Sequence, residues 1–468
     1  MNKFYITTAI PYVNAKPHIG HALEFVQADV VARFHKLKGD ETLLLSGGDE
    51  NALKNVAAAE KENTPIQEFV DKNSKLFLEL LKKLNVGFDI FQKGSDAGHH
   101  LFSQELWKLC EAAGDIYKKE YKGLYCVGCE LFYEKNELDE NGECFEHPGK
   151  KLEEVSEVNY FFKLSKYQKQ IEELLTSDKL KIIPQNRKNE ALSFLKQGLK
   201  DISVSRSNKR TKNWGVDVPD DSTQKMYVWF DALNIYRSGL GDKYNKFWPA
   251  DLHVIGKGIL RFHAIYWPAF LLSAKIPLPK QIFVHGYFTI DGQKISKSLG
   301  NTIDPAEIIE KYGVDALRYY LLKEIPPTED GDFSEKKLQT LYNSDLANGI
   351  GNLVARVAKL CERNEITCLN DLNHLSESVE GLIQEYKFNE ALAFIWSKIS
   401  EADKKINEVK PWELSKEKAT PVLQDLVKII RQIAVNLQPF LPETTEKIEE
   451  QFKGPKIISH PPLFPRII

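Results

Sequence analysis

The first 50 residues alternate between two hydrophobic patterns, and this alternation restricts the fold more than any other feature. The apolar run KFYITTAI has the composition of a buried strand, and a bend from Pro11 to Pro17 follows it. Apolar residues then recur at helical spacing until Gly39, and a second buried-type strand, ETLLLSGGDE, ends in glycines. This order predicts the opening βαβ unit of a parallel, doubly wound (Rossmann-type) α/β sheet, with a binding crevice at the carboxyl ends of the strands.

The rest of the chain divides into regions that differ in composition and hydrophobic pattern. A length of 468 residues favours roughly three domains. In the middle of the chain, tyrosine, lysine, glutamate and pairs of cysteines replace the sheet-like pattern. The pattern resumes in MYVWFDAL, LHVIGKGI and QIFVHGYF. Near the end of the chain, the apolar residues recur at helical spacing. We therefore expect a sheet domain in two halves (1–115 and 226–285), an insertion (116–225), a connecting region (286–335) and an all-α helix bundle (336–468).

Composition excludes several classes of protein. The net charge is −3, so a nucleic-acid surface must be local, and the run SNKRTKNW (207–214) is one candidate and equally a solvated loop. No stretch approaches the roughly 18 apolar residues of a membrane span, and the start lacks the layout of a signal peptide. The six cysteines do not resemble a disulfide framework. We expect a soluble cytoplasmic protein that does not bind membranes.

The tetrapeptide HIGH places His18 and His21 at the start of the first predicted helix. Unpaired backbone N–H groups and the helix dipole favour an anion there. Two imidazole donors, with Gly20 allowing close approach, would form a cradle for a nucleotide. Two surface histidines that cap a helix are the alternative.

A second candidate for phosphate chemistry is DGQKISKSLGN (291–301), in which Lys294, Lys297 and Ser298 lie in a loop flanked by glycines. Ammonium groups on such a loop can follow the charge of a triphosphate as it redistributes during phosphoryl chemistry. A solvated basic loop is the ordinary explanation of a single pattern of this kind.

Two short motifs in the insertion have the spacing of a zinc site. CVGC and CFEH contain Cys126, Cys129, Cys144 and His147, with 14 residues between the two pairs. Three thiolates and one imidazole complete a tetrahedral shell, so the predicted zinc is structural, with one ion per chain. Cysteines without a metal in a loop are the alternative.

HIGH and KISKS together resemble the two signatures of class I aminoacyl-tRNA synthetases, in which KMSKS is the usual form of the second. Further segments resemble the methionyl family, among them TTAIPYVNAKPHIGH, GLYCVGCELFY, DISVSR, YVWFDAL, FHAIYWPAFL, YGVDALRYYLL and KPWEL. The resemblance covers essentially the whole chain. It implies L-methionine, ATP with Mg²⁺, and tRNA(Met) as ligands, a zinc knuckle in the connective insertion, and a signature loop with a stem-contact region at 286–335.

The resemblance also assigns binding residues. The positions that match the methionine site are Ile10, Tyr12, Asp49, Trp229, Ala232, Tyr236, Ile259 and His263. Asp49 is expected to hold the α-ammonium group, and the aromatic and aliphatic wall suits a thioether. The positions implied for ATP are His18, Gly20, His21, Lys257, Lys294, Ser296, Lys297 and Ser298, with Arg206 near the active site. Of these, His18, His21, Lys294 and Lys297 are expected to be catalytic.

Three positions depart from the family pattern. Asn51 and Ala52 stand where His-Gly is frequent, and Gly258 stands where the family usually has Asp. These departures leave Asp49 and Lys257 in place, but Gly258 has no side chain with which to make one polar contact expected in the active site.

The helical tail contains positions that match those with which the methionyl family reads the CAU anticodon. Asn352 and Arg356 are four residues apart, so they share one helix face, and Trp412 follows Pro411. For an unrelated bundle, the same residues would be a surface polar pair and a packed tryptophan.

The implied reaction has two steps. The methionine carboxylate attacks the α-phosphorus of ATP, and the terminal ribose hydroxyl of the tRNA then takes the acyl group. Among the alternatives, synthetases with a large editing insertion need more than 116–225, and the cysteine enzyme has a zinc cysteine where this chain reads TTAIPY. A noncatalytic tRNA-binding paralogue would not need the signature histidines and lysines. We expect a monomer, because the chain ends at PPLFPRII without a further carboxyl-terminal domain.

Overall fold

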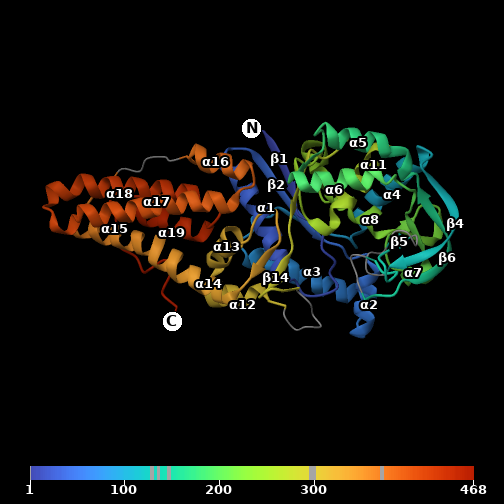
Figure 1. The fold of residues 1–468 in the computed structure, drawn as a ribbon, viewed down its shortest axis with the longest axis horizontal. Helices are drawn as coiled ribbons and strands as arrows, with labels where there is room; N and C mark the ends of the chain where they lie inside the picture. The colour runs from blue at the N-terminus through green and yellow to red at the C-terminus, as the bar shows by residue number, and fades with distance from the viewer. Residues whose placement is uncertain are drawn as a thin grey trace. The chain divides into compact units, whose positions relative to one another are not determined.

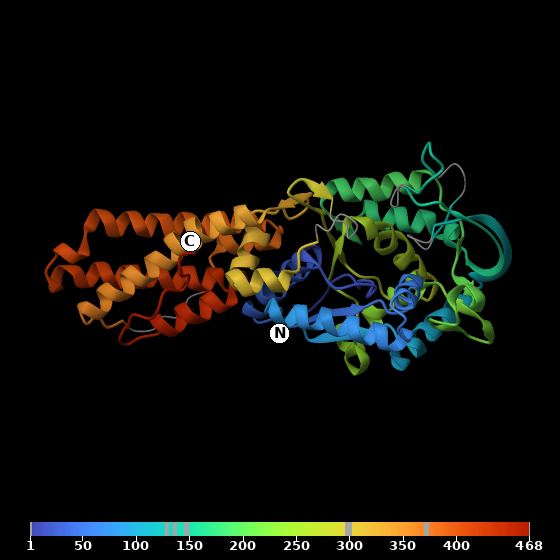
Figure 2. The ribbon, with the colours of Figure 1, turned by 90° about the horizontal axis from the view of Figure 1, so that it is seen from below.

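The computed structural model describes residues 2–126, 131–133, 138–144, 149–294, 302–368 and 374–467 (Figures 1 and 2). These residues form two compact units. The first unit consists of Met1–Pro17, Gly39–Leu80 and Phe88–His285, and the second of His18–Lys38, Leu81–Gly87 and Gly286–Ile468. Within the described ranges, no helix is both long enough and apolar enough to cross a membrane.

A parallel six-stranded sheet organises the first unit. Its strands, in spatial order, are β3 (Ile90–Lys93), β2 (Glu41–Gly48), β1 (Lys3–Thr7), β12 (Leu252–Gly256), β13 (Gln281–His285) and β7 (Lys181–Ile183). The strand order switches direction between β1 and β12, where Ile6 is opposite Leu252 and Thr7 is opposite His253. Loops after these two strands therefore diverge and leave room for a ligand at the carboxyl edge of the sheet. The predicted parallel sheet is confirmed.

Ten α-helices begin in the first unit among the described residues. They are α2 (Leu53–Lys61), α3 (Ile66–Lys83), α4 (Ala97–Ala112), α5 (Gln168–Thr176), α6 (Gln185–Lys196), α7 (Asn208–Thr211), α8 (Val228–Ala232), α9 (Ile235–Ser238), α10 (Tyr244–Phe247) and α11 (Trp267–Ser273). Aromatic side chains join α4, α8 and α11 in one core: the ring centroids of Trp107 and Phe230 are 5.4 Å apart, and those of Phe230 and Phe270 are 4.7 Å apart. This core fixes the short helix α8 against its neighbours.

Two smaller antiparallel sheets come from the middle of the chain. One contains β5 (Leu131–Tyr133), β4 (Ile116–Cys126), β6 (Glu153–Phe162) and β8 (Ile202–Ser203), and the other contains β10 (Asp217–Val218), β11 (Asp221–Met226) and β9 (Ser205–Ser207). β4 and β6 form the long curved ribbon in Figure 1. The same stretch of sequence also supplies β7 to the main sheet.

The second unit is mainly helical. Its helices are α1 (Ile19–Leu37), α12 (Pro305–Tyr312), α13 (Val314–Lys323), α14 (Glu335–Leu341), α15 (Asn352–Arg363), α16 (Glu377–Gln384), α17 (Phe388–Val409), α18 (Lys416–Leu437) and α19 (Pro442–Phe452). A π-helical segment, Tyr342–Gly351, joins α14 to α15. A small sheet contains β15 (Gln293–Lys294), β14 (Phe288–Ile290) and β16 (Gly331–Phe333).

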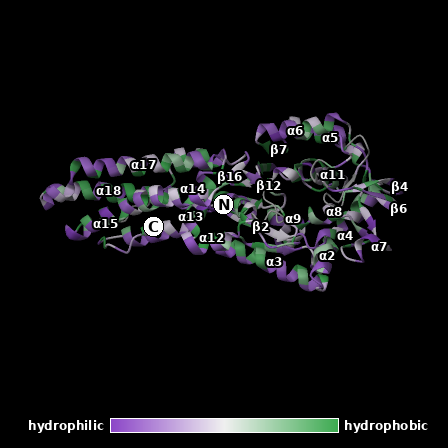
Figure 3. Ribbon diagram, turned by 60° about the horizontal axis from the view of Figure 1, so that its bottom comes forward, coloured by the Kyte–Doolittle hydropathy of each residue, from purple (hydrophilic) through white to green (hydrophobic). Residues whose placement is uncertain are grey.

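Amphipathic helices form the bundle of the second unit. Apolar and polar residues alternate along α17 and α18 (Figure 3), and the apolar ones are buried between the helices. Such a face provides most of the stability of a helix in a protein, because burial removes apolar surface from water. The predicted helical carboxyl-terminal domain is confirmed. The zinc knuckle and the predicted domain boundaries stay predictions.

Candidate active site

The two histidines of HIGH cap the start of α1. The Nδ1 atom of His18, the N-cap residue, accepts a hydrogen bond from the backbone N–H of Gly20 at 3.1 Å. The Nδ1 atom of His21 accepts one from the backbone N–H of His18, also at 3.1 Å. Because both Nδ1 atoms are acceptors, each neutral ring carries its proton on Nε2. Capping and ligand binding are therefore compatible: one nitrogen of each ring holds the helix, and the other is a donor.

Gly20 has a local structural role as well. A Cβ atom at this position would lie 3.0 Å from Cε1 of His18 and 3.1 Å from its Nδ1. Any side chain would therefore crowd the capping imidazole. Glycine therefore favours the observed cap, in addition to the close approach of a ligand that the sequence suggested.

A backbone hydrogen bond links the two signature segments within the second unit. The N–H of Ile19 donates to the carbonyl of Ile303 at 3.3 Å. Lys294 lies in β15, where it is opposite Thr289 of β14. The predicted residues Ser296, Lys297 and Ser298 lie outside the described residues, so their roles stay predictions. Ile303, which lies shortly before α12, is thus held at the start of α1.

The first unit brings together the predicted methionine-binding residues from three parts of the chain. Tyr12 forms a parallel bridge with Asp49, and the backbone N–H of Asp49 donates to Pro11 at 2.9 Å. The ring of Tyr12 meets the edge of Trp229 at 6.3 Å. Trp229 in turn stacks on Phe262, with centroids 3.7 Å apart. The first loop, the end of β2 and helix α8 therefore share one aromatic cluster.

A π-helical turn, Phe262–Tyr266, orients the other side of this cluster. π-Helical turns are rare and often occur at functional sites. This one places Phe262 against Trp229 and lets His263 meet Tyr236, whose hydroxyl lies 2.8 Å from Nε2 of the imidazole. The Nδ1 atom of His263 lies 2.9 Å from the carbonyl oxygen of Ile259. Nδ1–H must therefore donate to the carbonyl, and Nε2 accepts from the tyrosine.

Burial keeps this imidazole neutral. Desolvation lowers the pKa of His263 to about 4, although the hydrogen bond to Ile259 acts in the opposite direction. Nearby, His253 of β12 is also completely buried, and its Nδ1 lies 2.6 Å from the hydroxyl of Thr7. Desolvation lowers the pKa of His253 well below its usual range, and the neighbouring His263, were it protonated, would act in the same direction. Both imidazoles are therefore neutral at neutral pH, which suits an apolar ligand group.

Other predicted residues of the first unit lie around this pocket or close to it in sequence. Ala232 is buried in α8, while Ile10 and Ile259 are half-buried and pack against the core. Lys257 and Ile259 are part of the turn that follows β12. Arg206 of β9 is buried, and its guanidinium lies 4.5 Å from the ring centroid of Tyr227, the residue before α8.

Two of the four predicted zinc ligands can be located. Cys126 ends β4 and Cys144 lies between β5 and β6, and both are buried. Cys129 and His147 lie outside the described residues. Among the residues that are described, no three His, Cys, Asp or Glu side chains form a metal-binding group. The two located thiols suit a closed site of the predicted kind, since both are shielded from water.

The predicted anticodon residues lie together at one end of the bundle. Arg356 of α15 lies over the ring of Trp412, with 5.7 Å between the guanidinium carbon and the ring centroid. It also donates to Oδ1 of Asn407 at 2.7 Å. Asn352 is exposed, Pro411 is buried, and the Trp412 side chain is 41% exposed. The alternative of a tryptophan packed in the core is therefore wrong.

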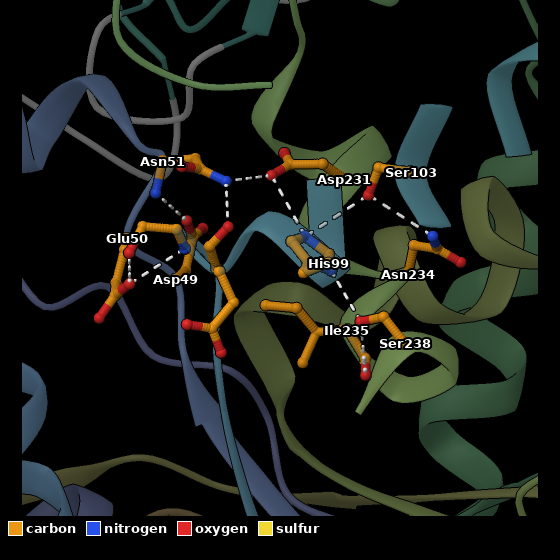
Figure 4. A network of polar contacts seen from close by, with 12 residues as sticks. Asp49, Glu50, Asn51, His99, Ser103, Asp231, Asn234, Ile235 and Ser238 are labelled. Atoms are coloured by element: carbon orange, nitrogen blue, oxygen red, sulfur yellow. Dashed lines mark hydrogen bonds and ion pairs between the residues drawn. The ribbon is translucent and has the colours of Figure 1, made fainter. Parts of the chain in front are cut away.

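Sequence reasoning missed a polar network beside the pocket (Figure 4). It joins Asn51 after β2, Asp231 of α8 and His99 of α4. These residues are far apart in the sequence and belong to no common motif. The only signal was that Asn51 departs from the family pattern.

Known proteins resemble this chain along most of its length. Residues 4–358 match the family model of tRNA synthetases class I (M), and residues 366–467 match that of the anticodon-binding domain of tRNA ligase. A methionine–tRNA ligase of Rhizobium meliloti is 42% identical over 95% of this chain and 90% of its own length. One of Rickettsia felis is 42% identical over 96% and 92%, respectively.

A solved structure is similar along the whole chain. The methionyl-tRNA synthetase of Mycobacterium tuberculosis in complex with methionyl-adenylate superposes with a TM-score of 0.93 at 36% identity, and the match covers 100% of each chain. The apo form of the same protein gives a TM-score of 0.86 at 34% identity.

The buried neutral His263 should make stability depend on pH. The pKa of His263 falls from its usual 6.5 to about 4 on folding. Between these two pH values, the unfolded chain therefore binds a proton that the folded chain does not. Stability should therefore fall as pH decreases from about 6.5 to about 4, by about 3 kcal/mol for this group. Urea titrations between pH 4.5 and 7 should show a smaller fall for His263→Gln than for the wild type.

The exposed His460 provides the control for the loss of one imidazole. His460→Gln should keep the pH dependence of the wild type. Equal slopes for the His263→Gln and His460→Gln proteins would contradict the assignment.

Proposed function

Because the chain belongs to the class I tRNA synthetases of the methionine type, we propose that the aromatic cluster around Trp229, Tyr236 and His263 binds the methionine side chain. The chain activates L-methionine with ATP to give methionyl-adenylate and transfers the methionyl group to tRNA(Met). The observation that carries the pocket assignment is the neutral Tyr236–His263 pair within an aromatic wall. A thioether is apolar and polarisable, so aromatic rings and an uncharged imidazole solvate it well.

Asp49 is proposed to hold the other end of the amino acid. Its carboxylate is buried at the end of β2, beside Tyr12, and accepts a hydrogen bond from the N–H of Asn51 at 3.2 Å. A buried carboxylate is strongly stabilised by a cation, and the α-ammonium group of the substrate is such a cation. The substrate carboxylate is then left for chemistry.

In the first step, this carboxylate oxygen attacks the α-phosphorus of ATP in line, and pyrophosphate leaves with the electron pair of the broken P–O bond. The Nε2–H groups of His18 and His21 and the ammonium groups of Lys294 and Lys297 are proposed to stabilise the phosphate charge. Lys257, Gly20, Ser296 and Ser298 complete the proposed ATP site, and Arg206 is a further active-site candidate. Mg²⁺, carried with ATP, would neutralise phosphate charge.

In the second step, the terminal ribose hydroxyl of tRNA attacks the carbonyl carbon of the adenylate, and AMP leaves. Neither step needs a protein nucleophile. Catalysis depends on holding the reacting groups in place and on stabilising charge, for which the proposed residues are sufficient.

Methionine-dependent ATP–pyrophosphate exchange tests the pocket. Tyr236→Phe removes the proton that His263 accepts and leaves a buried nitrogen without its donor, which costs about 1–3 kcal/mol. We expect the KM for methionine to rise about ten- to hundredfold, with the KM for ATP nearly unchanged. Leucine should support exchange poorly in the wild type.

Tyr167→Phe is the matched control, because it removes a buried hydroxyl that lies in the same unit and is bonded to Asp115. It should leave both KM values unchanged. Faster exchange with leucine than with methionine would refute the proposed substrate, and an unchanged Tyr236→Phe protein would refute the pocket.

Zinc is proposed at Cys126, Cys129, Cys144 and His147, where it would hold the insertion together. Metal analysis should find about one zinc per chain, and Cys144→Ser should lose most of it, since one thiolate of four is removed. Cys110→Ala should keep the zinc, because burial raises the pKa of the Cys110 thiol to about 12 and makes it a poor ligand. Full zinc content in the Cys144→Ser protein would contradict the site.

The end of the bundle is proposed to read the anticodon. Arg356 is held over Trp412 while the indole stays 41% exposed, so the ring offers a face to an unpaired base. Asn352 and Pro411 flank this surface in the proposal. Arg356 can donate to bases or phosphates from the same position.

Trp412→Ala should reduce tRNA(Met) charging about ten- to hundredfold, because base stacking on an aromatic ring contributes about 1–3 kcal/mol. Methionine-dependent exchange needs no tRNA and should stay normal, as should the melting temperature. Val409→Ala, which truncates an exposed apolar residue three positions earlier, is the control and should leave charging unchanged. Normal charging by the Trp412→Ala protein would remove the anticodon assignment.

The remaining assignments are proposals of the same kind. They comprise a cytoplasmic location, a monomeric state that sedimentation can test, and the division into 1–115, 116–225, 226–285, 286–335 and 336–468.

A further inference from the structure

Asn51 connects two buried carboxylates that belong to different parts of the first unit. Its Nδ2 donates to Oδ2 of Asp231 at 2.6 Å and to the carbonyl of Gly94 at 2.8 Å (Figure 4). Its backbone N–H donates to Oδ1 of Asp49 at 3.2 Å. Asp49 is 3% exposed and Asp231 is 1% exposed, so these bonds lie out of water, where they are strongest.

Asp231 is next in sequence to residues of the proposed methionine pocket. Asp231 lies in α8, between Trp229 and Ala232, which line the proposed methionine pocket. Asn51 lies two residues after Asp49, on the loop that follows β2. Asn51 thus links two parts of the proposed site: its backbone N–H contacts Asp49, the residue proposed to hold the α-ammonium group, and its side chain contacts Asp231 of the helix that forms the wall for the thioether.

A second set of contacts supports Asp231 from the opposite direction. Nε2 of His99 lies 3.6 Å from Oδ2 of Asp231, and Nδ1 of His99 lies 2.8 Å from the hydroxyl of Ser238. Ser103 and Asn234 extend this line of polar contacts. Figure 4 shows them as one continuous network from the β2 loop to α9. Asp231 is therefore held between α4 and the β2 loop.

The chemistry of the Asn51 amide fits a bridging role. A carboxamide has two N–H donors on one nitrogen, and here one meets a carboxylate and the other a backbone carbonyl. An apolar residue at position 51 would leave both acceptors buried without these donors, which disturbs packing around a buried carboxylate. An imidazole would provide one N–H donor in that direction, enough for Asp231 but not for Gly94 as well.

We propose that Asn51 is a positioning residue for amino-acid recognition: it fixes the distance between the Asp49 carboxylate and the aromatic wall on α8. It acts through Asp49 and Asp231. This assignment rests on the proposed methionine pocket. Because methionine is held at both ends, a change in the distance between the two ends weakens its binding, while ATP binding does not depend on it.

Exchange kinetics of Asn51→Leu, which keeps the approximate size and removes both donors, test the assignment. We expect the KM for methionine to rise at least tenfold and the KM for ATP to change less than about twofold. Asn51→His should recover most of the loss, since it restores one donor to Asp231. The matched control is Asn159→Leu, which removes another fully buried asparagine of the same unit, whose amide lies 3.5 Å from Glu157.

Three outcomes would overturn the assignment. An unchanged KM for methionine in Asn51→Leu would show that the bridge is not needed. A parallel rise of both KM values, with a drop in melting temperature like that of Asn159→Leu, would show a general structural role. Absence of methionine-dependent exchange in the wild type, measured in the same assay, would overturn the proposed function and this assignment with it, so the two failures are distinguishable.

Discussion

The parallel pairing of β1 with β12 is the constraint on which the amino-acid site depends. It places Thr7 opposite His253, although these residues are separated by 246 positions. The loop after β1 therefore leaves the sheet beside the turn after β12, and residues from both can face one ligand. The hydroxyl of Thr7 is hydrogen-bonded to Nδ1 of His253 inside the sheet, so a polar contact as well as apolar packing favours this register. Without this register, Tyr12 and His263 would have no reason to share a cluster.

The second unit depends on a different interaction, a completely buried ion pair. Arg318 of α13 lies 2.7 Å from Asp29 of α1, and neither side chain is exposed to solvent. The guanidinium also donates to the carbonyl oxygens of Phe440, Pro439 and Leu84, so its N–H groups have several acceptors. A buried pair compensates its desolvation only when such additional bonds are present. The signature helix is thereby joined to the turn between α18 and α19, and the HIGH segment belongs to the same compact unit as the bundle.

Much of this architecture follows from local sequence patterns. The buried-type strands, the helical spacing of the tail and the HIGH cap are encoded within short windows, so periodicity and composition predict them. The methionine-site residues followed only from family resemblance, since Trp229 and Tyr236 alone are indistinguishable from core aromatics. The network through Asn51, Asp231 and His99 was not predictable, because long-range packing brings these residues together. Pro421 shows the converse: a proline usually interrupts a helix, yet α18 continues through it, since tertiary packing of its apolar face outweighs one lost hydrogen bond.

The two halves of the first chemical step make opposite demands on the protein. Recognition of an uncharged thioether requires a pocket whose polar groups are all engaged with one another, because an unpaired polar group or a charge would favour water over methionine. In the proposed pocket, Tyr236 and His263 are hydrogen-bonded to each other, and burial lowers the pKa of the imidazole. Stabilisation of phosphate charge requires donors directed at the ligand instead. The proposed ATP site would use the HIGH cap for this purpose: Nδ1 of each ring accepts a hydrogen bond at the start of the helix, which commits the proton to Nε2. In both places one hydrogen bond to the backbone fixes the tautomer of a histidine, and the tautomer decides whether the ring serves as an acceptor inside the pocket or as a donor to the ligand.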